Sequence, residues 1–314
     1  MSARYSDFSQ GWRGRAVCVA GVAILMLAIL LTGCSREDAP VTPSTSTPAA
    51  KVCEVLFAYG SEKEKWVDDV TASFNGSNQQ VGDGLTIHVT PKAMGSGALI
   101  DDVLAGQLQA VIVSPASGAF IKLGNARSRA MTGKNLFTPT ENLLLSPVVI
   151  AMWNPMADAL SSGGRQVGWA DILKLAQSKN GWAEFGHPEW GSFKFGHTHP
   201  EYSNSGLISL IAECYAGAGK VKDLSRSDLE DPKVTTFLRD VERSVVHYGT
   251  STGFFGRRMF ADGPAYLSAA VLYENMVIEA SQQSPRVDPP IVAIYPTEDP
   301  AGATTLPAWL IATG

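Results

Sequence analysis

Apolar residues along the chain form short continuous runs that alternate with stretches of helical periodicity. The runs Val52–Ala58, Leu85–Thr90 and Ala110–Val113 have the length of buried strands. A helix is expected after the first run, with one apolar face made of Trp66, Val67, Val70 and Phe74. A second helix is expected around Leu99–Leu104. This β-α-β-α-β order predicts a mostly parallel sheet covered by helices on both faces.

A second group of apolar segments follows and predicts a second α/β lobe. Its strand-like and helix-like segments are Leu143–Trp153, Trp169–Leu175, Tyr266–Tyr273 and Ile291–Tyr295. Five aromatic residues are expected to cover this lobe or a neighbouring domain: Trp182, Phe185, Trp190, Phe193 and Phe195. A chain of 314 residues with 45% hydrophobic content is long enough for two lobes.

The start of the chain has the pattern of a lipoprotein leader. Arg4, Arg13 and Arg15 precede an apolar stretch, residues 16–31, which is shorter than the roughly 20 residues of a transmembrane helix. The segment Leu31–Cys34 resembles the lipobox at which bacteria lipidate and cleave exported lipoproteins. We expect residues 1–33 to be a signal peptide and Cys34 to carry the lipid. An uncleaved membrane anchor is the alternative, and either one places the rest of the chain outside the cytoplasm.

Composition narrows the possible partners of the exported chain. Residues 34–50 are rich in Pro, Ser and Thr and are expected to form a flexible tether after the lipidated cysteine. Removing the leader takes away three of 25 basic and one of 30 acidic residues, which leaves a net charge of −7. Nucleic-acid binding is therefore not expected. Cys53 and Cys214 are placed in different lobes, so a disulfide between them is not favoured.

Small polar residues and glycine follow three of the predicted strands. Ser61 and Ser96 each precede a helix, and Glu64 would complete a capping box with Ser61. The segment Ser203–Ser205 precedes a third helix. A helix N-terminus offers unpaired N–H groups and a partial positive charge, so each position suits a polar or anionic ligand. One such serine is ordinarily only a cap, but three in one α/β chain favour a binding site.

The order of these motifs resembles a known family. The segments Phe57–Ser61, Met94–Gly97, Ser114–Ser117, Trp169–Leu173 and Gly196–Gly206 together are similar to bacterial extracellular solute-binding proteins of the molybdate and sulfate type. They also resemble the solute-binding half that accompanies von Willebrand A domains in some exported bacterial proteins. The resemblance runs from about Val52 to the end of the chain.

This resemblance implies a type 2 periplasmic-binding-protein fold, in which a ligand cleft separates two α/β lobes. Lobe 1 is expected at 51–147 and lobe 2 at 148–287, with 288–314 returning to lobe 1. The family's domain normally finishes with further helical sequence, whereas residues 306–314 are strand-like, which suggests a truncated relative or an absent final helix. The family also implies a small-molecule ligand and an ABC permease or another envelope protein as partner.

The resemblance also assigns ligand-binding positions to this chain. They are Ser61, Ser96, Gly97, Ser114, Ser203, Asn204, Ser205, Tyr273 and Glu274. Glu274 is unexpected in an anion site, because its carboxylate would repel a dianion. A neutral, cationic or metal-bearing solute therefore stays open, as does a Glu274 side chain that faces solvent.

Other chemistry is less favoured by the sequence. No nucleophile elbow, P-loop or Rossmann fingerprint occurs, so neither an enzyme nor a catalytic residue is expected. A zinc site among His187, Glu189, His197 and His199 is conceivable, but hydrogen-bonded turn histidines explain the pattern better. No metal or cofactor is expected. The sequence thus predicts a lipid-anchored receptor of an ABC-type uptake system in the cell envelope. The alternative is an envelope-anchored sensor or protein-interaction module with the same fold.

Overall fold

The structure is a computed structural model that describes residues 51–82, 84–161, 164–296 and 311–313. The expected signal peptide, Cys34 and most of the tether lie outside the described residues. In the part of the chain that is described, no helix is both long enough and apolar enough to cross a bilayer. Cys53 and Cys214 are both free thiols.

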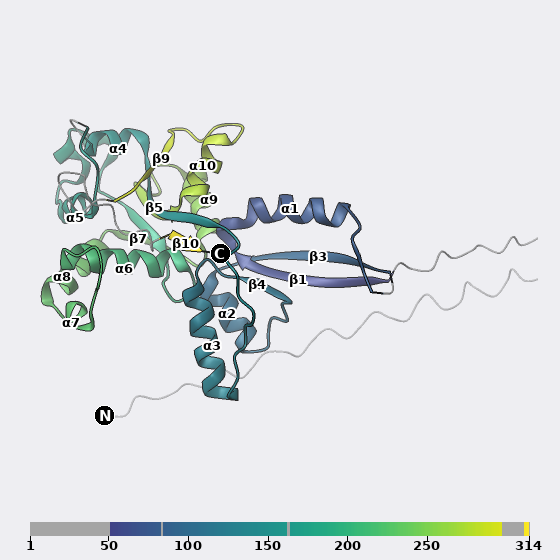
Figure 1. Ribbon diagram of the computed structural model, residues 1–314. Coiled ribbons are helices and arrows are strands. Elements are labelled where there is room, and N and C mark those ends of the chain that lie inside the picture. The colour runs from purple at the N-terminus through teal and green to yellow at the C-terminus, as the bar shows by residue number, and fades with distance from the viewer. Residues whose placement is uncertain (1–50, 83, 162–163, 297–310, 314) are drawn as a thin grey trace, which may run out of the picture. The chain divides into compact units, whose positions relative to one another are not determined.

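The first lobe is built on a sheet of the order β2-β3-β1-β4 (Figure 1). Its strands are β1 (Val52–Gly60), β2 (Gln80–Val81), β3 (Leu85–Met94) and β4 (Ile112–Ser114). β1 runs parallel to both β3 and β4, and the short β2 is antiparallel to β3. Because β3 and β4 flank β1 in parallel, the carboxyl ends of all three strands meet at one edge of the sheet.

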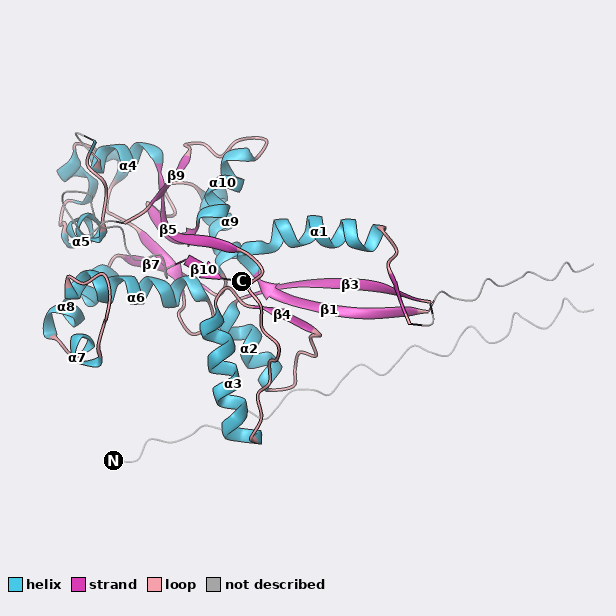
Figure 2. Cartoon of the chain, in the orientation of Figure 1, coloured by secondary structure: helices cyan, strands magenta, loops and turns pink. Residues whose placement is uncertain are grey.

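Helices cover both faces of this first sheet. They are the 3-10 turn η1 (Ser61–Lys63), α1 (Glu64–Gly76), α2 (Ser96–Leu104) and α3 (Gly118–Thr132). Figure 2 shows α1 on one side of the strands and α2 with α3 on the other. The predicted β-α-β-α-β order and the two covered faces are therefore confirmed. The sequence did not predict β2, because a strand of two residues is too short to be recognised.

The second lobe has a mixed sheet of the order β10-β5-β8-β6-β7, and β9 also pairs with β5. Its strands are β5 (Leu145–Trp153), β6 (Phe195–Thr198), β7 (Val245–Gly249), β8 (Ala269–Tyr273), β9 (Ile291–Ile294) and β10 (Ile311–Thr313). β6 is parallel to β7 and β8, whereas β5 is antiparallel to β8, β9 and β10.

The helices of the second lobe surround this sheet. They are α4 (Asn154–Leu160), α5 (Trp169–Gln177), η3 (Gly181–Phe185), η4 (Pro188–Trp190), α6 (Asn204–Ala218), α7 (Arg226–Leu229), α8 (Pro232–Glu242), α9 (Thr252–Asp262) and α10 (Glu274–Gln282). α6 and α9 begin a few residues after β6 and β7, respectively, and α10 begins directly after β8. The strand ends of this lobe therefore also lead into helix N-termini.

The two lobes have hydrophobic cores of unequal size. The large core lies in the second lobe and includes the fully buried Trp153, Trp169 and Trp182. The five aromatic residues expected to cover this lobe all belong to the core or pack against it. The first-lobe core is a smaller cluster around Leu99, Ile100 and Phe120, with Ala58 and Leu108. Since each large buried side chain contributes about 1.5–3 kcal/mol, the second lobe holds most of the hydrophobic stabilisation.

Two details differ from the sequence predictions. α1 buries Val67 and Thr71, one turn apart, while Trp66 and Val70 remain exposed on the adjacent stripe, so the predicted apolar face was partly wrong. In the range expected to return to the first lobe, β9 pairs with Trp153 and its neighbours in the second sheet.

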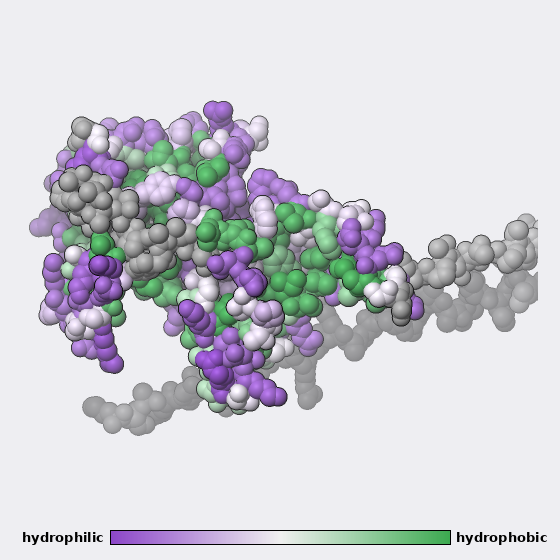
Figure 3. Space-filling model, in the orientation of Figure 1, coloured by the Kyte–Doolittle hydropathy of each residue, from purple (hydrophilic) through white to green (hydrophobic). Residues whose placement is uncertain are grey.

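Figure 3 shows hydrophobic residues gathered over the strands of the first sheet, between α1 and α3.

Candidate functional site

The candidate site lies where strand ends of the two lobes meet. The predicted residues Ser61, Ser96, Ser203, Asn204, Ser205 and Tyr273 are all at most 2% exposed. They stand at the starts of η1, α2, α6 and α10. Most of them are joined by hydrogen bonds within and between the lobes, so the structure brings together residues spread over more than two hundred positions of sequence.

Direct hydrogen bonds connect the lobes at this place. The backbone N–H of Gly253, in α9, donates to Ser61 Oγ at 2.9 Å. The N–H of Gly97, in α2, donates to the carbonyl oxygen of Tyr202 at 2.9 Å. Asn275 Nδ2 donates to the carbonyl oxygen of Glu62 at 2.9 Å. The described arrangement is therefore a closed one, in which oxygen atoms of one lobe accept from helix starts of the other.

The sequence predicted that Ser61 and Ser96 cap their own helices. In the structure they do not. Neither η1 nor α2 has a side-chain cap, and α1 begins at Glu64, past the predicted capping box. Ser96 Oγ instead accepts from the N–H of Ala116 at 2.9 Å, within the first lobe. The cap prediction was wrong because the hydroxyls bond to neighbouring segments that adjoin them only in the folded lobes.

A chain of hydroxyl groups lines the second-lobe side. Thr198 Oγ1 lies 2.8 Å from Ser205 Oγ, Ser205 Oγ lies 2.8 Å from Thr252 Oγ1, and Ser203 Oγ lies 2.9 Å from the same Thr252 atom. All four side chains are buried. Hydroxyls both donate and accept, so this chain is able to reorient its protons to suit a bound polar group.

Asn204 and Tyr273 form the next contact. Asn204 Nδ2 donates to the Tyr273 hydroxyl oxygen at 2.9 Å. Burial and then the negative charge of Glu62 raise the pKa of Tyr273 well above its usual value, although the hydrogen bond from Asn204 acts in the opposite direction. Tyr273 is therefore a neutral phenol at physiological pH, with its O–H available as a donor.

A buried ion pair stands on the first-lobe side. Glu62 and Lys63 are 6% and 3% exposed, and Lys63 Nζ lies 3.0 Å from Glu62 Oε1. Lys63 Nζ also donates to the carbonyl oxygens of Ser114 at 2.9 Å and Pro115 at 3.4 Å, so it fixes the end of β4. Charges at this depth are stable only when they are paired, and the pair places a carboxylate close to Tyr273.

Several buried polar atoms at these strand ends remain without a partner. Among the described residues, three such atoms have no hydrogen-bond partner: Asn204 Oδ1, Ser114 Oγ and Ser251 Oγ. Each such atom costs about 1–3 kcal/mol if nothing satisfies it. A bound molecule with hydrogen-bonding groups would remove that cost.

A cavity of about 200 Å³ opens beside this contact between the lobes. Ser61, Glu62 and Gly253 line it together with Glu64, Arg257 and Glu279. Arg257 and Glu64 form an ion pair across it at 2.5 Å. Burial raises the pKa of Glu279 above its usual value, opposed by its hydrogen bond from Asn275 and by nearby cations. The cavity is charged, and its volume is smaller than that of typical drug-sized sites.

Glu274 stands apart from this group. Its carboxylate is half-buried and accepts a hydrogen bond from Tyr295, which follows β9. The structure therefore gives Glu274 a partner at the molecular surface and no bond to the other predicted site residues.

The sequence reasoning missed important parts of the junction. Ser251, Thr252 and Gly253 follow β7 with the same polar and glycine chemistry as the other three loops, but β7 has too weak an apolar pattern to be noticed. Nothing in the sequence indicates that Glu62 and Lys63 are buried, because charged residues near a helix start are ordinarily exposed.

The histidines considered for zinc do not form one group. His187 Nδ1 lies 3.0 Å from Glu189 Oε1 in an exposed pair, and its ring stacks on Trp190. The ring of His199 contacts that of Tyr202. His197 points into the second lobe and has different partners, which are described below.

Comparisons with known proteins identify the fold. No protein-family model and no curated protein sequence matches the chain. A solved structure of the sulfate-binding protein from Mycobacterium tuberculosis is 14% identical, with a TM-score of 0.52 over 77% of this chain and 71% of that one. The chain has the two-lobed fold of the periplasmic solute-binding proteins. At this identity the similarity shows the fold and leaves the solute open.

Two further structures are similar at lower scores. A fructose-6-phosphate-bound periplasmic binding protein from Actinobacillus pleuropneumoniae is 11% identical, with a TM-score of 0.49 over 78% of this chain and 70% of that one. A periplasmic thiamin binding protein is 9% identical, with a TM-score of 0.49 over 79% and 69% of the two chains.

Proposed function

We propose that this chain is a lipid-anchored receptor that binds a small polar solute between its lobes and delivers it to an ABC-type permease. The lipoprotein leader and the tether support export and anchoring. The fold supports solute binding, because it is the fold of the sulfate-binding protein to which the chain is similar. The observation that carries the proposal is the set of buried, unpartnered polar atoms at the ends of strands from both lobes.

The proposed solute carries hydrogen-bond donors. Asn204 Oδ1 only accepts hydrogen bonds, and the buried carboxylate of Glu62 also accepts. The starts of α2 and α9, which would suit an anion, already donate to Tyr202 and Ser61 in the closed arrangement. A hydroxylated or ammonium-bearing solute therefore fits these atoms better than a dianion such as sulfate or molybdate does.

A ligand screen tests this function. The full chain, solubilised in detergent, is screened by thermal shift against oxyanions, sugars, amino acids and metal chelates. We expect at least one donor-bearing solute to raise the melting temperature, since a ligand at a hundred times its Kd adds about 2.7 kcal/mol of stability. A folded protein that no compound stabilises, and that retains no solute in native mass spectrometry, would contradict the proposal.

A second candidate function is an envelope-anchored sensor or protein-interaction module. It is favoured by the close backbone contact of the lobes, in which a Cβ added to Gly97 would lie only 1.7 Å from the carbonyl oxygen of Glu201. Small-angle scattering distinguishes the two functions. A receptor changes its radius of gyration when solute binds, whereas a permanently closed scaffold keeps the same radius with every compound.

A further inference from the structure

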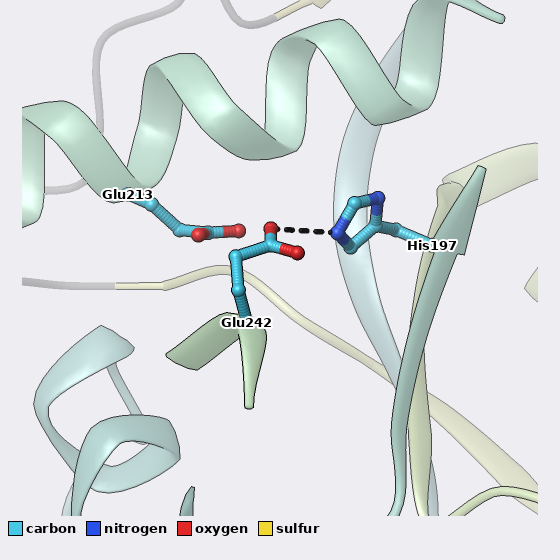
Figure 4. A group of neighbouring side chains, drawn as sticks. All are labelled: His197, Glu213 and Glu242. Carbon is cyan, nitrogen blue, oxygen red and sulfur yellow. Dashed lines mark hydrogen bonds and ion pairs between the residues drawn. The ribbon is translucent and has the colours of Figure 1, made fainter. Parts of the chain in front are cut away.

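A group of buried polar side chains lies within the second lobe, separate from the contacts between the lobes. His197 comes from β6, Glu213 from α6 and Glu242 from the end of α8, and Figure 4 shows their polar ends pointing toward one another. One atom of each side chain lies within 4.8 Å of the other two. Glu213 is completely buried, and Glu242 is 23% exposed.

The contacts of His197 direct its two ring nitrogens toward two different acceptors. His197 Nδ1 lies 2.8 Å from the carbonyl oxygen of Thr198, which only accepts, so Nδ1 carries a proton. In the neutral ring Nε2 is then a bare lone pair. It lies 2.9 Å from Glu242 Oε1, which also accepts. Two acceptors at this distance require either a proton on Nε2, which would make the contact an ion pair, or a metal ion that both atoms bind.

Glu213 adds a second carboxylate to the same place. Its Oε1 accepts from the Ser209 hydroxyl at 2.9 Å, and its Oε2 has no hydrogen-bond partner among the described residues. No lysine or arginine in the described part of the chain pairs with Glu213 or Glu242. An ionised carboxylate buried without a partner costs several kcal/mol, so this arrangement is stable only with a bound cation or a proton.

The surrounding contacts are those of a built metal site. Metal-binding histidines usually donate their second ring N–H to a backbone carbonyl, as His197 does to Thr198, and metal-binding carboxylates are themselves hydrogen-bonded. Glu213 accepts from Ser209, and Glu242 Oε2 accepts from the Tyr248 hydroxyl at 2.6 Å. All three candidate ligands are therefore already oriented by an outer partner.

We propose that His197 Nε2, Glu213 and Glu242 bind a zinc ion. One imidazole with two carboxylates suits zinc better than magnesium or calcium, which prefer oxygen ligands only. Three protein ligands would leave the fourth position of a tetrahedral zinc ion for water. The ion joins β6, α6 and α8 and neutralises the two carboxylates in the core of the second lobe.

Zinc titration of the full chain tests this site. The protein in detergent is stripped with a chelator and titrated with zinc chloride alone. We expect one bound zinc ion per chain and a higher melting temperature in its presence. X-ray absorption should show one nitrogen and the carboxylate oxygens at about 2.0–2.2 Å from the ion.

Glu213→Gln is the decisive variant because glutamine has the same shape without the charge. We expect it to keep the fold and to weaken zinc binding at least about tenfold. Glu189→Gln, in the exposed His187 pair, is the matched control and should bind zinc like the wild type.

Two results would overturn the proposal. One is a folded wild-type protein that takes up no zinc at one equivalent. A proton on Glu213, and not a metal ion, would then neutralise the buried carboxylate. The other is equal zinc affinity in Glu213→Gln and the wild type. Solute binding between the lobes uses none of these three side chains, so the two proposals fail independently.

Discussion

Ser61 follows β1 directly and Ser96 follows β3 after one glycine, yet their hydroxyls bond to different lobes. Ser61 Oγ accepts from Gly253 of the second lobe, whereas Ser96 Oγ accepts from Ala116 of its own lobe. The first bond crosses from one lobe to the other, whereas the second lies within the first lobe. Substitution by alanine should therefore change different properties of the molecule.

We predict that Ser61→Ala weakens solute binding about threefold to tenfold, because a net hydrogen bond is worth about 0.5–1.5 kcal/mol. Ser96→Ala should instead lower the free energy of unfolding by about 1–3 kcal/mol, because it leaves a buried N–H unpaired. Calorimetric affinity with the solute found in the screen and chemical denaturation, measured on both variants, check the prediction. Equal affinity in Ser61→Ala and the wild type would contradict the role of Ser61 in closure.

At the scale of one element, the start of α2 controls how closely the two lobes approach each other. Gly95 and Gly97 lie against the backbone of the segment before α6, where an added Cβ would lie 2.3 Å from Tyr202 O and 1.7 Å from Glu201 O. Real Cβ atoms do not come this close to backbone oxygens. Glycine is thus required at these positions because of the opposite lobe, and not because of helix geometry.

We predict that Gly97→Ala prevents full closure and weakens solute binding at least about tenfold. The reason is steric, since the backbone of residue 201 has to move away from the new methyl group. Gly118→Ala is the matched control, because Gly118 also lies in the first turn of a helix and a Cβ there meets nothing within 4 Å. Small-angle scattering should show a larger radius of gyration for Gly97→Ala only. A normal radius with normal affinity would sink the prediction.

The sequence predicted the order of elements in the first lobe well and the local chemistry of its helix starts poorly. Strand runs and helical periodicity are local signals, so β1, β3 and β4 were found from the pattern alone. The partners of Ser61 and Ser96 are nonlocal. No spacing rule reveals that Gly253 will donate to Ser61 from 192 positions away.

The zinc ligands illustrate the same limit. His197 was noticed because other histidines lie near it in sequence, but its partners Glu213 and Glu242 come from two different helices. In the sequence each of these glutamates lies in a helix, where a charged residue is ordinarily exposed. Only the fold of the second lobe brings their carboxylates close to His197.

At the scale of the whole molecule, we assign solute binding and membrane anchoring to different segments of the chain. The proposed solute site lies in the two described lobes, whereas the segment expected to hold the chain at the membrane lies outside the described residues. A receptor that delivers solute to a permease gains from being held at the bilayer, where the encounter is nearly intramolecular. The leader is therefore a necessary part of the proposed function.

We predict that Cys34→Ala abolishes lipidation of the chain, because the Leu31–Cys34 segment places only this thiol at the lipid-acceptor position. Cells labelled with palmitate should show label in the wild type and an unlabelled precursor in the variant. Cys18→Ala is the matched control, since Cys18 lies inside the apolar stretch of the same leader and should keep the label. Unchanged label in Cys34→Ala would transfer the anchor to Cys18 or to an uncleaved helix, while leaving the solute site and the zinc site to be judged by their own tests.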